Sequence, residues 1–220
     1  MIIVGQGVGD CDSGFLQEFQ ERTGTVIISE NLSNMSFVSN ADQILHVYDV
    51  DEGLRPDFLI TVGGHVVSKR LKNFIRKYPP LHHWHLGRDS RVVDTYKCVD
   101  RIFPNWKLKE LLAELVVTTE RSVSGFSDKW YGYSNSIVPP FFEEEPKEVS
   151  SYAAVKYLLA SGIQGNLHLA NSSAVRISQL FRNESLKYFC NRGINGIDGS
   201  LSTAVGYSAS HNRGVGEFDF

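Results

Sequence analysis

The sequence has few cysteines, no long apolar run and no excess of positive charge, and each absence excludes a class of protein. The 220 residues include three cysteines, Cys11, Cys98 and Cys190, which are too scattered for a disulfide framework or a paired-cysteine metal site. No run of about 18 apolar residues predicts a transmembrane helix. A formal net charge of −3 gives neither the basic surface typical of nucleic-acid binding nor a polybasic membrane anchor. We therefore expect a cytoplasmic protein that binds no nucleic acid and inserts into no membrane.

Short apolar segments alternate with amphipathic segments in the first half of the chain, which is typical of strands alternating with helices. We expect strands at residues 2–4, 25–29, 57–62, 81–86 and 95–99, and helices around residues 15–19, 41–48 and 68–77. The helix at 68–77 is expected to turn Leu71, Phe74 and Ile75 inward. Short connections between such elements predict a parallel sheet with right-handed crossovers, an α/β fold with a Rossmann-like sheet flanked by helices.

The composition then changes, which indicates three segments: a Rossmann-like domain at 1–105, a connector at 106–149 and a second α/β domain at 150–220. After an expected helix around Leu111 to Val116, the connector is rich in aromatic residues from Trp130 to Phe142, contains Pro139-Pro140 and ends in the acidic run Glu143–Glu145. It is too aromatic to be a free linker, so we expect it to pack across a domain boundary.

The last segment predicts the opening of a second α/β domain. We expect helices at 150–160, 174–181 and 200–207, and strands at 167–170 and 187–190. Because a strand begins almost at residue 1 and the second domain is unfinished at Phe220, we interpret the chain as a fragment of a longer protein.

Two weaker patterns have ordinary structural explanations. In Gly5-Gln-Gly-Val-Gly9 the third glycine comes one residue early for a dinucleotide fingerprint. We therefore favour a tight turn. In the alternative, a nucleotide site, Glu30 would bind the ribose. His82, His83 and His85 have no carboxylate or cysteine at ligand spacing, which favours a partly buried strand over a metal site.

Lys69 and Arg70 stand in the first turn of the expected helix at 68–77, after a strand and the pair Gly63-Gly64. Cations at a helix N-terminus oppose the macrodipole and cost a few tenths of a kcal/mol. They indicate either an anion site or two solvated surface cations, and the sequence leaves both interpretations open.

Arg176 and Arg192 each follow a short apolar strand and stand beside hydroxyl or amide groups. Ends of strands that turn into helices are where open α/β sheets gather ligands, and an arginine fork binds a carboxylate with two hydrogen bonds. The alternative is an ordinary helix cap at Asn171 or Ser172 with a salt-bridged arginine. Ile197 lies between glycines and would be exposed unless it contacts a ligand or another domain.

At these residues the chain resembles a known family. The motif Asn-Ser-x-x-x-Arg, from Asn171 to Arg176, and the element Asn-Arg-Gly-x-x-Gly-Ile-Asp-Gly, from Asn191 to Gly199, are similar to 2-succinyl-5-enolpyruvyl-6-hydroxy-3-cyclohexene-1-carboxylate synthase. That family belongs to menaquinone biosynthesis. Ser68-Lys-Arg-Leu71 is similar to its middle-domain motif. The resemblance implies a middle domain followed by the start of a pyrophosphate-binding domain.

The resemblance also implies a transferase reaction. Thiamine diphosphate, with Mg²⁺, would decarboxylate 2-oxoglutarate and add the resulting carbanion to isochorismate, because the cofactor performs the carbanion chemistry while the protein positions the substrates. Ser172, Arg176 and Arg192 would contact the carboxylates of the substrate or intermediate. Lys69 and Arg70 would help to bind these groups from the middle domain. Ile197 would be the apolar wedge beneath the bent cofactor.

The family's cofactor-activating glutamate lies in a preceding domain, and its metal motif would follow the helix at 200–207. We therefore expect no catalytic residue and no metal ligand in this chain. The isolated chain should be inactive and bind neither cofactor nor Mg²⁺, while the full-length family is homo-oligomeric. The tail after Ser210 departs from the family pattern.

Two alternatives remain open. The first domain could act alone as an anion-binding regulatory or structural module at Lys69 and Arg70. The chain could also belong to another thiamine-diphosphate decarboxylase, which would have an apolar residue in place of Arg176 or Arg192.

Overall fold

The computed structural model divides the chain into two compact units, Met1–Val138 and Pro139–Phe220, called unit 1 and unit 2 below. Among the described residues, no helix combines the length and the apolar character needed to cross a membrane. The structure describes residues 1–8, 12–50, 52–87, 93–118, 125–137, 149–193 and 196–211, with only the backbone for 117 and 118.

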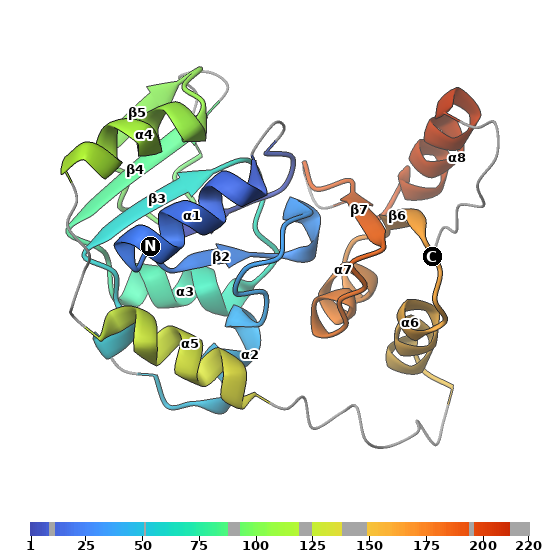
Figure 1. Ribbon diagram of the computed structural model, residues 1–220. Helices are drawn as coiled ribbons and strands as arrows, with labels where there is room; N and C mark the ends of the chain where they lie inside the picture. Colours follow the sequence, from blue (N-terminus) through green and yellow to red (C-terminus); the bar gives the residue numbers. More distant parts are fainter. Residues whose placement is uncertain are drawn as a thin grey trace. The chain divides into compact units, whose positions relative to one another are not determined.

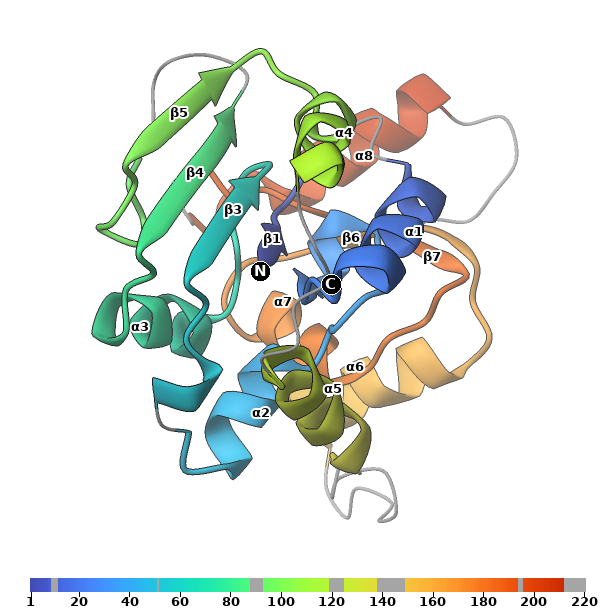
Figure 2. The same cartoon turned by 60° about the vertical axis from the view of Figure 1, so that its left-hand side comes forward.

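Unit 1 is built on a sheet of parallel strands, as the sequence predicts (Figure 1). Its five strands follow the order β2-β1-β3-β4-β5, and Figure 2 shows β1, β3, β4 and β5 side by side. The central strands are short apolar runs because helices cover both faces of the sheet. The strands are β1 (Ile2–Val4), β2 (Ile27–Ser29), β3 (Phe58–Val62), β4 (His82–Gly87) and β5 (Arg101–Pro104).

Helices cover the sheet in two layers. Helices α1 (Ser13–Thr23) and α4 (Leu108–Thr118) pack on the face that receives Ile2 and Val4. Helices α2 (Ala41–Val47), α3 (Lys69–Lys77) and α5 (Phe126–Ser136) pack on the face that receives Ile3. Successive residues of β1 therefore enter opposite cores, as strand alternation requires. Short 3₁₀ turns at Asn31–Ser33 and Glu52–Leu54 complete the elements described in this unit.

Helix α3 confirms the prediction made from its apolar spacing. Leu71 and Ile75 are fully buried and Phe74 is 6% exposed. Ser68 caps the helix, because its hydroxyl accepts a hydrogen bond from the Leu71 amide at 2.9 Å.

The predicted strand at 95–99 is wrong, since the fifth strand begins at Arg101. The Asp94 carboxylate accepts hydrogen bonds from the amides of Lys97 and Val99, and Lys97 has a φ of 62°. A side chain that bonds the backbone just ahead of it makes a turn and competes with strand pairing.

The aromatic segment after residue 106 contributes helices to unit 1. Trp130 on α5 is fully buried in the core that contains Ile3, and its indole N–H donates to the Leu54 carbonyl at 3.2 Å. Helix α4 buries Leu111 and Leu112 in the other core. Pro139, Pro140, Phe142 and Glu143–Glu145 lie outside the described residues.

Unit 2 contains a parallel pair of strands, β6 (Gly165–Leu169) and β7 (Leu186–Cys190). Helix α6 (Ser151–Ala160) begins at the cap Ser150, as predicted. The helix expected at 174–181 is α7 (Ser173–Ile177) followed by a 3₁₀ turn at Ser178–Leu180. Helix α8 (Ser200–His211) follows the glycine-rich turn, and residues 212–220 lie outside the described part.

Candidate functional site

The turn from β6 into α7 holds Ser172 in a strained backbone conformation. Its φ is 70° and its ψ is −115°, in the region that favours glycine. Such a conformation costs about 1–3 kcal/mol in a non-glycine residue and persists only where the surroundings enforce it. The Ser172 side chain is exposed and makes no hydrogen bond within the described part of the chain. The turn therefore presents a hydroxyl outward at the carboxyl end of a strand.

Asn171, one residue earlier, joins this strand end to the next one. Its amide nitrogen donates to the carbonyls of Asn191 and Gly196 at 2.5 and 2.6 Å. Its amide oxygen accepts a hydrogen bond from Arg192 Nη1 at 2.7 Å and one from the Cys190 thiol at 3.4 Å. Burial raises the pKa of the Cys190 thiol, which keeps this donor protonated. Asn171 thus fixes the end of β7, the glycine-rich turn and one arginine at once.

Sequence reasoning missed this function of Asn171 and weighed it only as a helix cap. The available signal was an amide residue directly after one predicted strand, together with a second predicted strand of the same length. Because parallel strands end at the same edge of a sheet, a side chain there can bond the neighbouring strand's continuation.

Two of the predicted site residues are the arginines of unit 2, and the structure places them differently. Arg192 is half-buried, is oriented by Asn171, and keeps a buried Nε without a hydrogen-bond partner in the described residues. Arg176 lies in the last turn of α7, four residues after Ser172. The Arg176 side chain is exposed and forms no ion pair within the described residues.

The glycine-rich turn leads into the N-terminus of α8. The Asn191 amide donates to Thr203 Oγ1 at 2.8 Å and to the Gly199 carbonyl at 3.3 Å, which fixes the start of the helix. The Ser200 hydroxyl is buried without a partner among the described residues. Ile197, in the turn, is 73% exposed. An exposed apolar side chain and, three residues later, a buried hydroxyl without a partner are both features that a bound ligand would satisfy.

The other two predicted residues, Lys69 and Arg70, lie in unit 1. Arg70 Nη1 donates to the Asp42 carboxylate at 2.8 Å, and its Nη2 lies 3.4 Å from His46 Nδ1. The exposed side chain of Lys69 borders a cavity instead and makes no ion pair in the described residues. Of these two neighbouring cations, Arg70 is therefore neutralised by a carboxylate, while Lys69 faces a cavity.

Buried Glu30 explains how α3 tolerates cations in its first turn. Its carboxylate accepts hydrogen bonds from the amides of Val67 and Ser68, the latter at 2.7 Å. Desolvation raises the pKa of Glu30, while these amides favour its ionised form. Glu30 and Asp42 supply the negative charge that the helix N-terminus prefers. The carboxylate considered above as a ribose ligand is thus engaged in capping α3.

The three histidines of β4 are divided among separate contacts. His82 Nδ1 lies 3.0 Å from the Asp100 carboxylate, while His83 and His85 both contact the Thr61 hydroxyl. Within the residues that the structure describes, no group of three His, Cys, Asp or Glu side chains gathers as a metal site would require.

Together these features define an α/β protein in which polar and charged side chains stand at the carboxyl ends of the strands. The family described as "Middle domain of thiamine pyrophosphate" matches residues 1–126. The chain therefore belongs to this family of thiamine-pyrophosphate-enzyme middle domains, which confirms the middle domain that the resemblance implies.

Comparison with curated proteins shows which enzymes of this class the chain is similar to. The chain is 34% identical to a 2-succinyl-5-enolpyruvyl-6-hydroxy-3-cyclohexene-1-carboxylate synthase of Bacteroides thetaiotaomicron, covering 97% of the chain and 39% of that protein. It is 34% identical to the Flavobacterium johnsoniae synthase, with 97% and 40% covered, and 33% identical to the Desulfotalea psychrophila synthase, with 97% and 39% covered. The chain thus spans about two fifths of the length of these relatives.

Proposed function

We propose that this chain is part of a thiamine-diphosphate-dependent transferase that joins 2-oxoglutarate, after loss of carbon dioxide, to isochorismate. The similarity to synthases of this name supports the reaction. The observation that carries the proposal is the position of Arg192. Its guanidinium is held at the end of β7 by Asn171, which directly precedes the strained Ser172. By the same resemblance we propose a cytoplasmic homo-oligomer, and we expect the isolated chain to be inactive.

In this proposal the residues of unit 2 bind and orient carboxylates. The two substrates carry four carboxylates between them, and a guanidinium can donate two parallel hydrogen bonds to each one it meets. Arg192 is already oriented through Nη1, and Arg176 is free to reach a ligand. Ser172 adds a hydroxyl donor from a turn whose backbone strain fixes its direction. Lys69 and Arg70 add positive charge from unit 1.

The residues present also fit the cofactor. Ile197 offers an exposed apolar surface, while Ser200 and the N-terminus of α8 offer polar groups that suit an anion. Thiamine diphosphate supplies, when bound, the electron sink for decarboxylation and carbon–carbon bond formation. We include Mg²⁺ as the counter-ion of the diphosphate. No three His, Cys, Asp or Glu side chains gather within the described residues, and the proposal names no Mg²⁺ ligand in this chain.

Steady-state kinetics of the protein that contains this chain test the proposal. Arg176→Ala and Arg192→Ala should each lower kcat/KM about 10- to 100-fold, because a charge-assisted hydrogen bond contributes about 1.5–3 kcal/mol. Arg192→Lys should remain impaired, since lysine lacks the planar fork. Lys187→Ala, which removes an exposed cation of β7, is the matched control and should change kcat/KM less than twofold. Unchanged kcat/KM in both arginine variants would refute the assignment.

A further inference from the structure

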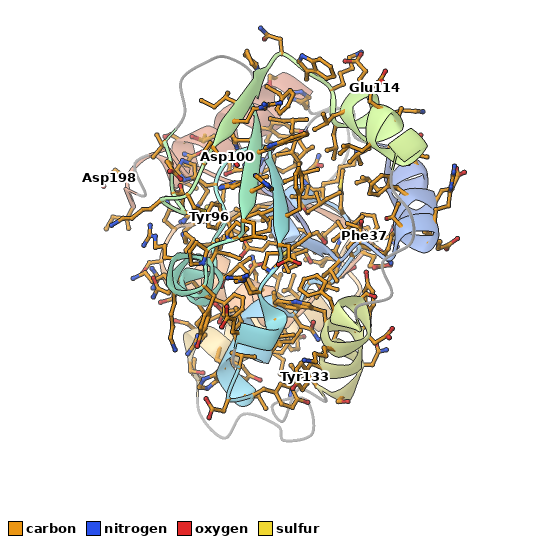
Figure 3. The ribbon with its side chains drawn as sticks, turned by 90° about the vertical axis from the view of Figure 1, so that its left-hand side faces the viewer. Phe37, Tyr96, Asp100, Glu114, Tyr133 and Asp198 are labelled. Atoms are coloured by element: carbon orange, nitrogen blue, oxygen red, sulfur yellow. The ribbon has the colours of Figure 1, made fainter. Side chains whose placement is uncertain are left out.

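The turn between β7 and α8 presents an exposed isoleucine on a glycine-rich backbone. Ile197 has Gly196 before it and Gly199 two residues after it, and Gly199 has a φ of 81°. Glycine loses more conformational freedom on folding than any other residue, so such a turn is costly to hold in one conformation. Ile197 is 73% exposed, and Asp198, which extends from the turn in Figure 3, makes no hydrogen bond within the described residues. The position of the turn therefore depends on the groups that bind its carbonyls.

Asn171 holds the first of these carbonyls. Its amide nitrogen donates to the Gly196 carbonyl at 2.6 Å and to the Asn191 carbonyl at 2.5 Å. The Asn171 side chain is 5% exposed and its amide oxygen also accepts hydrogen bonds, so its orientation is fixed. The residue before Ile197 is thus tied to the end of β6.

Asn191 and Thr203 hold the second carbonyl, on the other side of Ile197. The Asn191 amide nitrogen donates to Thr203 Oγ1 at 2.8 Å and to the Gly199 carbonyl at 3.3 Å. Because the amide nitrogen only donates, Thr203 accepts this hydrogen bond and gives its own proton to the Gly199 carbonyl, at 2.8 Å. The Ser202 hydroxyl also donates to this carbonyl, at 3.1 Å.

The two asparagines are joined to each other as well as to the turn. Asn191 offers its carbonyl to Asn171 and its side chain to Thr203. One network of hydrogen bonds therefore runs from the end of β6, past the end of β7, to the first turn of α8. Ile197 lies between the two carbonyls that this network binds, so its backbone is held on both sides although its side chain is exposed.

This network contributes more to binding than to folding. Asn191 and Thr203 are both exposed, so their hydrogen bonds compete with water and add little to the stability of unit 2. A group that is ordered before a ligand arrives, however, spares the ligand the entropy of ordering it. The exposed apolar side chain held in this way is that of Ile197.

We propose that Asn191 and Thr203 are positioning residues for thiamine diphosphate, because they hold Ile197 in place through the Gly199 carbonyl before the cofactor binds. Their role rests on the proposed function, in which Ile197 contacts the cofactor. They add to it two residues that contact neither cofactor nor substrate and act through Ile197.

Calorimetric titration with thiamine diphosphate and Mg²⁺, on the apo form of the protein that contains this chain, tests their role. Thr203→Val removes the hydroxyl but keeps the branched shape of the side chain, and it should raise the Kd of the cofactor about 5- to 10-fold. Thr203→Ser keeps the hydroxyl and should bind within about twofold of the wild type. Asn191→Ala should raise the Kd by about the same factor as Thr203→Val, since the donor is lost.

A double-mutant cycle separates positioning from a merely structural role. In an Ile197→Ala background, Thr203→Val should change the Kd less than about twofold, because the side chain to be positioned is gone. Amide exchange in β6 and β7 should change less than about threefold in Thr203→Val, since unit 2 stays folded. The control is Ser210→Ala, which removes a hydroxyl that donates to the Tyr207 carbonyl at 2.9 Å at the other end of α8. It should change the Kd less than about twofold.

Failure of this role differs from failure of the proposed function. If the wild type bound no thiamine diphosphate, the proposed function would fail and the positioning role with it. If the wild type bound the cofactor but Thr203→Val left the Kd unchanged, or raised it equally with and without Ile197, only the positioning role would be overturned.

Discussion

Replacing Asn171 with leucine removes every hydrogen-bonding group of a buried side chain while keeping the number and branching of its heavy atoms. The residue is 5% exposed and makes two hydrogen bonds to carbonyls, one to the Arg192 guanidinium and one to the Cys190 thiol. A neutral bond contributes about 1 kcal/mol and one to a charged group about 1.5–3 kcal/mol. The thiol is a weak donor, so Asn171→Leu should destabilise unit 2 by about 3–5 kcal/mol.

The tryptophans make this effect separable from the rest of the molecule. Trp84, Trp106 and Trp130 all lie in unit 1, so their fluorescence reports the unfolding of that unit alone. Amide hydrogen exchange in β6 and β7 reports unit 2. We expect exchange there to accelerate on the order of 1000-fold, since 1.4 kcal/mol is a factor of ten, while the fluorescence transition stays in place.

The matched control is Asn166→Leu, an asparagine of β6 whose side chain makes no hydrogen bond within the described residues. It should change exchange in the same strands less than about threefold. If Asn171→Leu and Asn166→Leu gave equal exchange rates, Asn171 would not stabilise the strand ends and the reasoning would be refuted.

Three further predictions concern stability. His83 has its pKa lowered by burial from 6.5 to about 4, so the unfolded chain takes up the proton first, and unit 1 should lose about 3 kcal/mol as the pH falls through this interval. Urea titrations at several pH values should show this loss in the wild type beyond that in His83→Asn, and equal pH dependence in the two would contradict it. Ser172→Gly should stabilise unit 2 by about 1 kcal/mol because glycine accepts the positive φ, whereas Ser172→Ala should not; slower amide exchange only in the glycine variant is the expected result. Trp130→Ala should cost about 4 kcal/mol in urea unfolding followed by circular dichroism, against less than about 1 kcal/mol for the 45% exposed Trp106→Ala, and similar values would show that α5 is not part of the core.

Local patterns in the sequence predicted the parallel sheet and the buried face of α3, because strand and helix periodicities are short-range properties. They misplaced the last strand of unit 1, because the turn at Asp94 depends on one carboxylate bonding two particular amides. An apolar stretch and a turn containing Tyr96 look alike in composition, and only the fold shows that this side chain is buried beside α3.

The candidate site also contains residues that local sequence predicts and residues that only the fold brings into place. Arg176 and Arg192 were identified from their position after short strands, and Arg192 proves to be anchored there. The anchor itself, Asn171, depends on contacts across 20 and 25 residues, as Glu30 depends on contacts across 37 and 38 residues. Contacts of this range follow from the topology of the sheet, which no local motif encodes. Whether Ser172, Arg176, Arg192 and Ile197 bind substrate and cofactor stays a prediction.

Substrate discrimination by the protein that contains this chain tests the central claim most directly. With isochorismate and thiamine diphosphate present, kcat/KM should be measured for 2-oxoglutarate and for 2-oxobutyrate, which lacks the second carboxylate. We predict a preference of at least about 100-fold for 2-oxoglutarate, which falls tenfold or more in Arg176→Ala or Arg192→Ala and survives in Lys187→Ala. No product from 2-oxoglutarate, or a preference unchanged in both arginine variants, would contradict the account.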